Sequence, residues 1–226
     1  MSVFAQRVDT NKVRTAVVPS ILKKDVTVVK IAPVYDTIIR NSCYTSYYSF
    51  SERNPALVTY LLYRGGGDIS RKGMNFRDEK LNTSKFATNA DYSGTGYDKG
   101  HMANAADFSN DKNRLLSTFK FYNCVPQAPG LNRGAWEIYE GRIRNASMKD
   151  SLFIVCYNHF SSVKMHDRVS IPDTCYKIVY VIKDGVRTYD KELSACFTNT
   201  QSAEPMDIPK SKLDYVMDII NTKKKK

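Results

Sequence analysis

The sequence predicts an α+β fold in which helices pack on a central, mainly antiparallel sheet. Short runs of β-branched and aromatic residues, which are typical of strands, recur along the chain. Asp184-Gly185 lies between two strand-like segments and is a strong signal for a tight hairpin. Near the end of the chain, apolar residues return at the spacing of one helix face. We therefore expect strands and helices in the same domain.

In the first half of the chain, three runs are typical of strands: residues 26–31, 44–50 and 57–63. The triplet Gly65-Gly66-Gly67 interrupts this pattern, and the composition is polar and charged from there to about Thr95. We expect a long loop over this stretch, carrying Arg71 and Arg77.

In the second half, residues 110–119 and 131–144 read as helices, and residues 120–125 read as a strand that ends at Pro126. Residues 152–157 are apolar throughout, as in a strand buried on both faces. The hairpin lies within residues 176–186. A last helix follows Ser211, a predicted N-cap with Asp214 three residues further on.

Length and composition favour one globular domain. The chain has 226 residues, of which 42% are hydrophobic, enough for one sizeable core. We expect a single domain over residues 1–222 and a basic tail at residues 223–226. For residues 1–34 an extra strand pair, a dimer arm and an occluding segment all remain open. The five cysteines form no CxxC pair, so we expect reduced core residues.

The charge balance indicates a class of partner. The formal net charge of +11 favours a polyanion such as nucleic acid, although basic proteins without that role are common. No apolar stretch reaches the roughly 20 residues of a membrane span, and the first residues lack the apolar core of a secretion signal. We expect no membrane association and a cytoplasmic location, which includes the cytoplasm of a phage-infected host cell.

Three short motifs follow one another between residues 97 and 141. They are Asp98-Lys99-Gly100-His101, Asn123-Cys124-Val125-Pro126-Gln127, and Leu131-Asn132 followed by Trp136 and Glu140. In order and spacing they resemble the DNA/RNA non-specific endonuclease family of ββα-metal nucleases, of the endonuclease G type. The likeness covers residues 60–186, including a later segment that ends in an aromatic residue and Lys177. It implies a ββα-metal motif in which His101 ends the first strand and Asn132 begins the helix.

The resemblance assigns the catalytic proton transfer to His101. Hydrolysis of a phosphodiester needs a deprotonated water and relief of charge on the phosphate. A histidine whose pKa is near its ordinary value of about 6.5 can accept that proton at neutral pH. His101 is therefore the expected general base. His159 and His166 match no metal-ligand spacing with cysteine, and we expect both to be structural or exposed to solvent.

The resemblance also implies a metal site at Asn132 and Glu140. Mg²⁺ prefers oxygen ligands and keeps most of its waters, so one amide oxygen can be its sole direct protein contact. Asn132 fits that role, and Mn²⁺ is an expected substitute. On one continuous helix Asn132 and Glu140 would be separated by about 12 Å of axial rise. We therefore expect Glu140 to hold a metal-bound water and Trp136 to pack the helix on the sheet.

Four further residues are expected to contact the substrate. Arg71 would bind the phosphate through its planar guanidinium. Arg77 is the alternative if the loop follows a different path through the site. Lys99 stands where the family has arginine, which keeps the charge and loses the planar fork. Asn123 would donate a hydrogen bond in the site or hold the turn before Pro126. Asp98 is expected to orient neighbouring backbone.

The sequence thus predicts a Mg²⁺-dependent endonuclease that hydrolyses phosphodiester bonds of DNA with little sequence preference, and we expect RNA as a further substrate. A nucleic-acid-binding protein that has kept the fold and lost turnover is the first alternative, and a sequence-specific homing-type nuclease is the second. Because such an enzyme endangers its own cell, an inhibitor protein is an expected partner. A homodimer is also compatible with the sequence.

Overall fold

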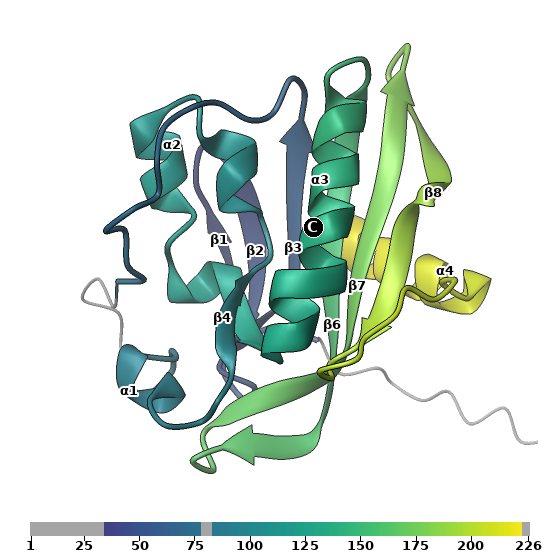
Figure 1. The fold of residues 1–226 in the computed structure, drawn as a ribbon. Helices are drawn as coiled ribbons and strands as arrows, with labels where there is room; N and C mark the ends of the chain where they lie inside the picture. Colours follow the sequence, from purple (N-terminus) through teal and green to yellow (C-terminus); the bar gives the residue numbers. More distant parts are fainter. Residues whose placement is uncertain (1–33, 78–82, 223–226) are drawn as a thin grey trace, which may run out of the picture. The chain divides into compact units, whose positions relative to one another are not determined.

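The structure, a computed structural model, describes residues 34–77 and 83–222, which all belong to the unit Pro33–Lys226. Its largest element is a six-stranded antiparallel sheet in the order β1-β2-β3-β6-β7-β8 (Figure 1). The strands are β1 (Thr37–Arg40), β2 (Tyr44–Ser49), β3 (Asn54–Leu62), β6 (Ser151–Met165), β7 (Val169–Lys183) and β8 (Val186–Thr198). The predicted α+β class and antiparallel sheet are confirmed.

Two helices cover opposite faces of this sheet, with α3 (Trp136–Ser147) on one face and α4 (Lys210–Asn221) on the other (Figure 1). Alternate residues of a strand point to opposite faces, which sorts β6 between the two layers. Leu152, Ile154 and Cys156 pack with the residues of α3. Phe153, Val155 and Tyr157 pack in the cluster that contains Val216 of α4. β6 is therefore apolar on both sides, as its sequence predicts.

A second, two-stranded sheet lies beside α3 and consists of β4 (Asp98–His101) and β5 (Cys124–Gln127). The strands are antiparallel, with His101 opposite Cys124 and Lys99 opposite Pro126. Gly100 allows their close approach, since a Cβ there would lie 2.0 Å from Oε1 of the buried Gln127. His101 ends β4, as expected.

Short helical elements surround this small sheet. α1 (Asn89–Tyr92) precedes β4, and α2 (Lys112–Ser117) lies between β4 and β5 together with the 3₁₀ turns Ala105–Phe108 and Phe121–Asn123. The side chain of Asp111 caps α2 by accepting from the backbone N–H groups of Asn113 and Arg114. The helix predicted over residues 110–119 is thus confirmed in a shorter form, whereas α1 was not anticipated in the expected loop.

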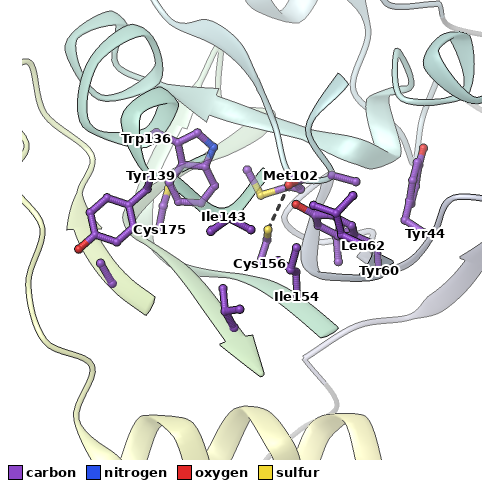
Figure 2. Close-up of a cluster of buried hydrophobic side chains, with 14 of the residues drawn as sticks. Tyr44, Tyr60, Leu62, Met102, Trp136, Tyr139, Ile143, Ile154, Cys156 and Cys175 are labelled. Atoms are coloured by element: carbon purple, nitrogen blue, oxygen red, sulfur yellow. Dashed lines mark hydrogen bonds between the residues drawn. The ribbon is translucent and has the colours of Figure 1, made fainter. Parts of the chain in front are cut away.

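The core fixes the backbone that follows His101. Cys156 of β6 donates its thiol to the carbonyl oxygen of Met102, at 3.1 Å (Figure 2). Trp136 and Ile143 of α3 enter the same cluster of buried side chains (Figure 2). All five cysteines are buried and free, in agreement with the prediction from their number and spacing.

Several predicted elements are confirmed by the sheet. β2 and β3 correspond to the strand-like runs 44–50 and 57–63. Asp184 and Gly185 form the turn between β7 and β8, and both have the positive φ angles of 49° and 78° that this turn needs. Residues 26–31, the rest of the N-terminal segment and the basic tail lie outside the described residues. Within the described ranges, no helix is both long and apolar enough to cross a membrane.

Two boundaries near the site differ from the prediction. β5 begins at Cys124 and continues through Pro126, because β5 is paired only with β4 and a proline without an N–H is tolerated on such an edge. The expected helix over residues 131–144 is interrupted: a wide turn, Leu131–Ala135, precedes α3, and Gly134 has the non-helical angles φ −120° and ψ −108°. Asn132 therefore precedes the α-helix that carries Glu140.

The start of α4 is a third correction. The helix begins at Lys210 with Pro209 as its N-cap, and no side chain caps it. The carbonyl oxygen of Pro209 accepts from the N–H groups of Lys212 and Leu213. Proline has an extended backbone here and needs no N–H of its own before a helix, so Ser211 lies within the first turn.

Candidate active site

A hollow of about 540 Å³ opens between β4, the wide turn and α3. We call it the main hollow. It is lined by Arg71, Asp98, Lys99, His101, Asn104, Ala106, Asn132, Arg133, Glu137, Glu140 and Arg144. It brings together Arg71, Lys99, His101, Asn132 and Glu140 of the predicted site residues. Arg77 and Asn123 do not line it.

The ring of His101 is held between two phenylalanines. The ring centroid of Phe76 lies 4.7 Å from that of His101, and the centroid of Phe119 lies 4.8 Å away in an edge-on arrangement. Nε2 of His101 is buried and has no hydrogen-bond partner. The carbonyl oxygen of His101 accepts from Nε1 of Trp136 at 3.3 Å. The imidazole and its backbone are therefore both fixed in position.

The surroundings of His101 disfavour its protonated form. Burial lowers its pKa to about 3, and the positive charges of Arg71 and Lys177 act in the same direction. The imidazole is thus neutral at physiological pH. Since Nε2 is enclosed by the protein and His101 lines the hollow, we infer that Nδ1 is the ring nitrogen that faces the hollow.

Asp98 orients the turn before α3. It accepts from Nδ2 of Asn132 at 2.9 Å and from Nε and Nη2 of Arg133 at 2.7 and 2.6 Å. Burial would raise the pKa of Asp98, but the hydrogen bonds from Arg133 and Asn132 outweigh it and lower the pKa below its ordinary value. The expected role of Asp98 in orienting backbone is corrected, because its contacts are with two side chains. With Nδ2 engaged, Asn132 keeps Oδ1 for a ligand.

Glu140 is held from two sides at the floor of the hollow. Its Oε1 accepts from Nζ of Lys177 at 2.7 Å, and its Oε2 accepts from Nδ2 of Asn104. Glu140 is 8% exposed, and Lys177 on β7 is fully buried. Burial would lower the pKa of Lys177, but the carboxylate of Glu140 outweighs it and raises that pKa. Burial raises the pKa of Glu140 to about 7, and the ammonium of Lys177 opposes this rise. The 2.7 Å contact between Nζ of Lys177 and Oε1 of Glu140 is a buried ion pair.

Three acids at or beneath the hollow are neutralised by neighbouring bases. The ion pairs are Asp98 with Arg133, Glu140 with Lys177, and Asp107 with Arg144. Among the described residues, no group of three or more His, Cys, Asp or Glu side chains could hold a metal ion together. The hollow is thus not an acidic cage, and Arg71 and Lys99 add positive charge to its lining.

The structure places Asn123 and Arg77 elsewhere. Asn123 is fully buried, its Nδ2 donates to the carbonyl oxygens of Ala103 and Thr118, and its Oδ1 accepts from the N–H of Ala103. Its amide is fully engaged with backbone, so it holds the segment after His101 and does not reach the hollow. Arg77 is exposed and lines a separate hollow beside Lys120.

Sequence reasoning assigned no role in the site to Asn104, Lys177, Arg133 and Arg144. Asn104 lies three residues after His101, and Lys177 interrupts an apolar strand, which is a recognisable sign of a buried partner. Arg133 and Arg144 lie close to Asn132 and Glu140 in sequence but carry no signal of their own. His159 pairs with Asp173 on the surface, His166 is exposed in a turn, and neither lines the main hollow.

Comparison with known proteins assigns the chain to a nuclease family. Residues 26–221 match the DNA/RNA non-specific endonuclease family, and the chain belongs to it. The members of this family are metal-dependent nucleases.

Individual relatives are consistent with this family. Human mitochondrial endonuclease G is 38% identical over 94 residues, which are 41% of this chain and 31% of that protein. A nuclease of Nostoc sp. (strain PCC 7120) is 30% identical over 157 residues, which are 68% of this chain and 57% of that protein. The matched region is thus less than two thirds of the length of either relative.

One solved structure shares the fold. A crystal structure of the EndoG/EndoGI complex superposes with a TM-score of 0.68 at 23% identity, covering 81% of this chain and 84% of that chain. At this level of identity the likeness supports the architecture alone.

Proposed function

We propose that this chain is a metal-dependent endonuclease that hydrolyses phosphodiester bonds of DNA and RNA with little sequence preference. The observation that carries the proposal is the main hollow, which collects Arg71, Lys99, His101, Asn132 and Glu140 from separate parts of the chain. Family membership supports the reaction class. The resemblance of the motifs supports a 5′ phosphate on the product.

In this proposal His101 removes a proton from the attacking water. Its neutral imidazole, with Nε2 enclosed, leaves the lone pair of Nδ1 for that proton. A bond forms between the water oxygen and phosphorus, and the bond from phosphorus to the 3′ oxygen breaks. The leaving 3′ oxygen takes a proton from solvent. Arg71 and Lys99 offset the negative charge of the phosphate.

The donor chemistry of the hollow fits a hard, hydrated cation. Asn132 offers Oδ1, and the carboxylate of Glu140 keeps lone pairs beyond those used by Lys177 and Asn104. We propose Mg²⁺, with Mn²⁺ as a substitute, held directly by Asn132 and through water by Glu140. The ion would supply charge relief for the phosphate and the leaving oxygen.

The proposed contacts also account for low sequence preference. Arg71 and Lys99 are suited to phosphate groups, which every nucleotide carries. Contacts to phosphate position the protein on the nucleic acid but do not distinguish one base from another. The formal charge of +11 adds attraction that is independent of sequence.

The test is cleavage of supercoiled plasmid and of single-stranded RNA by purified protein, with Mg²⁺ or with EDTA, beside His101→Ala. Wild type is expected to degrade both substrates only with Mg²⁺, and the variant is expected to lose activity by a factor of about 10² to 10⁴. His166→Ala is the matched control, because His166 is exposed in a turn away from the hollow.

A folded wild-type protein that shifts DNA on a gel and leaves it intact would reject this proposal. It would favour the alternative of a binding protein that has lost turnover. The observation behind that alternative is Lys99, which stands in place of the arginine of the family motif and offers no planar fork. Lys99→Arg would then be examined for recovered cleavage. Discrete fragments from a long substrate would instead indicate a sequence-specific nuclease.

We further propose that the chain binds an inhibitor protein, that it forms a homodimer, and that it is located in the cytoplasm. The EndoG/EndoGI complex supports the first by analogy. Light scattering of the purified protein tests the second, and fluorescence imaging of the tagged chain in its native cell tests the third.

A further inference from the structure

Lys177 is the one lysine that the structure buries completely within the described residues. It lies on β7, on the face of the sheet that packs against α3, between Cys175 and Val179 of the same buried cluster. Lysine is almost never fully buried unless its charge is paired. A buried ammonium in this apolar layer therefore needs a partner of opposite charge.

The partner of Lys177 is Glu140, a residue of the main hollow. Nζ of Lys177 lies 2.7 Å from Oε1 of Glu140 and 4.3 Å from the ring centroid of Trp136. Trp136 begins α3, and Glu140 is one turn further on. The ammonium thus enters the corner between the sheet and the first turns of α3.

A second anchor holds the other oxygen of Glu140. Nδ2 of Asn104 donates to Oε2, while Oδ1 of Asn104 accepts from the N–H of Ala106. Asn104 lies three residues after His101 and is 6% exposed. β7, α3 and the segment after His101 are therefore joined through one carboxylate.

This arrangement leaves Glu140 with a single orientation. Each carboxylate oxygen has one fixed donor, so the lone pairs that remain are directed by those two donors. Replacing a buried ion pair by apolar residues of similar size is often neutral or even stabilising. A lysine at this place is thus poorly explained by stability alone.

We infer that Lys177 is a positioning residue, which holds the carboxylate of Glu140 in one orientation, aimed into the main hollow for the metal site. The inference rests on the proposed function, since it concerns how that site is assembled. Lys177 itself touches neither the substrate nor the metal ion. It acts through Glu140, from the layer beneath the hollow.

The deciding experiment is a double-mutant comparison in the background of Glu140→Gln. Mn²⁺ binding is measured by electron paramagnetic resonance of the free ion, and kcat and KM are measured on plasmid. If Lys177 acts through Glu140, Glu140→Gln and Glu140→Gln/Lys177→Met should agree within about two-fold in Mn²⁺ affinity and kcat, because their coupling is lost. A further loss of about ten-fold or more in the double variant would overturn the inference.

The single variant Lys177→Met gives a second, independent reading. It should weaken Mn²⁺ binding by about 10 to 100-fold and lower kcat more than it changes KM. If this variant does not fold, the double variant still decides, since it contains no unpaired buried charge. A folded Lys177→Met protein with the Mn²⁺ affinity and kcat of wild type would also reject the inference.

Lys183→Met is the matched control. Lys183 ends the same strand, is exposed, and pairs only loosely with Asp150 at 3.9 Å. Its Mn²⁺ affinity and kcat should equal those of wild type, and a loss comparable to that of Lys177→Met would overturn the specific role of Lys177. Failure of the proposed function is recognised separately, because wild type itself would then neither cleave nucleic acid nor bind Mn²⁺.

Discussion

The carboxylate of Asp98 accepts hydrogen bonds from two neighbouring side chains, Asn132 and Arg133. Its contact with Asn132 sets which atom of that amide faces the hollow, whereas its contact with Arg133 lies at an exposed rim. A side chain that is hydrogen-bonded to a metal ligand commonly fixes the orientation of that ligand. The two contacts can be separated by substitution, because Asn132 and Arg133 donate to Asp98 from different side chains.

Asp98→Ala is therefore expected to reduce Mn²⁺ affinity and cleavage by about 10 to 100-fold. Asn132 would lose the acceptor that holds its Nδ2, and its amide could turn. Arg133→Gln, which keeps the contact from Asp98 to Asn132, should lie within about three-fold of wild type, since exposed ion pairs contribute little. The measurement is Mn²⁺ titration with plasmid cleavage; equal losses in both variants would show that the ion pair is what matters.

At the same scale, the sequence predicted residue types better than contacts. His101, Asn132 and Glu140 carry functional groups whose chemistry can be named without a structure, and all three line the hollow. The role of Asn123 could not be predicted in this way, because a side-chain amide can hydrogen-bond to a ligand or to the backbone equally well. Only the positions of Ala103 and Thr118 show that its donors are engaged.

Among the elements, the β4–β5 sheet depends on one glycine. A Cβ at Gly100 would meet Oε1, Cδ and Cγ of Gln127 at 2.0, 2.4 and 2.7 Å, and Gln127 is fully buried. The side chain of Gln127 would therefore have to shift within its buried surroundings. His101 follows directly on β4, so any displacement of this pair of strands reaches the proposed base.

Gly100→Ala should lower the free energy of unfolding by about 1–3 kcal/mol through overpacking, and should reduce kcat. Gly141→Ala on α3 is the matched control, because a Cβ there meets nothing within 4 Å. That control should raise stability by about 0.5–1 kcal/mol, the usual gain of alanine over glycine within a helix. Urea unfolding of both variants checks the pair, and a Gly100→Ala protein as stable as wild type would contradict the packing argument.

Asp91 joins α1 to the turn between β6 and β7. It accepts from the N–H and hydroxyl of Thr88 and from Nε of Arg168, at 2.8, 2.9 and 2.6 Å. Burial would raise the pKa of Asp91, but the hydrogen bonds from Arg168 and Thr88 outweigh it, and the pKa is lowered. The carboxylate thus binds its proton less readily in the folded state than in the unfolded state.

The sign of the pH dependence follows from that lowered pKa. The contribution of Asp91 to stability is present above the unfolded pKa of about 3.9 and is lost as pH falls through the folded pKa. Asp91→Asn should therefore be less stable than wild type at pH 7, and the difference in urea midpoint should shrink below about pH 4. A difference that stays constant down to pH 2 would exclude this carboxylate as the titrating group.

For the whole molecule, the excess of basic residues favours association with the proposed substrate, nucleic acid. A formal net charge of +11 favours any polyanion, and the affinity that comes from phosphate contacts falls linearly with salt on logarithmic axes. The main hollow adds Arg71 and Lys99 at one place. We expect affinity to depend on salt far more than on sequence.

This expectation is tested with His101→Ala, which allows binding to be measured without degradation. Adding Arg71→Ala should reduce the magnitude of the salt slope by about one, and should weaken binding equally for unrelated sequences. Adding Lys183→Met should leave the slope unchanged, since Lys183 lies at the β7–β8 hairpin outside the hollow. The measurement is fluorescence anisotropy with labelled duplexes over a range of salt concentrations. An unchanged salt slope in the Arg71→Ala variant would show that Arg71 does not contact a phosphate.

The sequence by itself determined the α+β class, most of the strands and the Asp184-Gly185 turn, and it supplied the residues that we propose as the main functional groups. These features are local: side-chain alternation, turn chemistry and short motifs act over a few neighbouring residues. The boundaries that failed, at Pro126, Gly134 and Ser211, are places where an edge strand or a backbone break replaces the usual local signal.

Only the tertiary structure decided how those groups meet. The pairing of Lys177 with Glu140 spans 37 positions of sequence, and Asp98 reaches Asn132 across 34. Such contacts depend on how α3 lies on the sheet and on where the break at Gly134 leaves the turn before it. Local patterns carry no information about either, because both are settled by packing between segments that are distant along the chain.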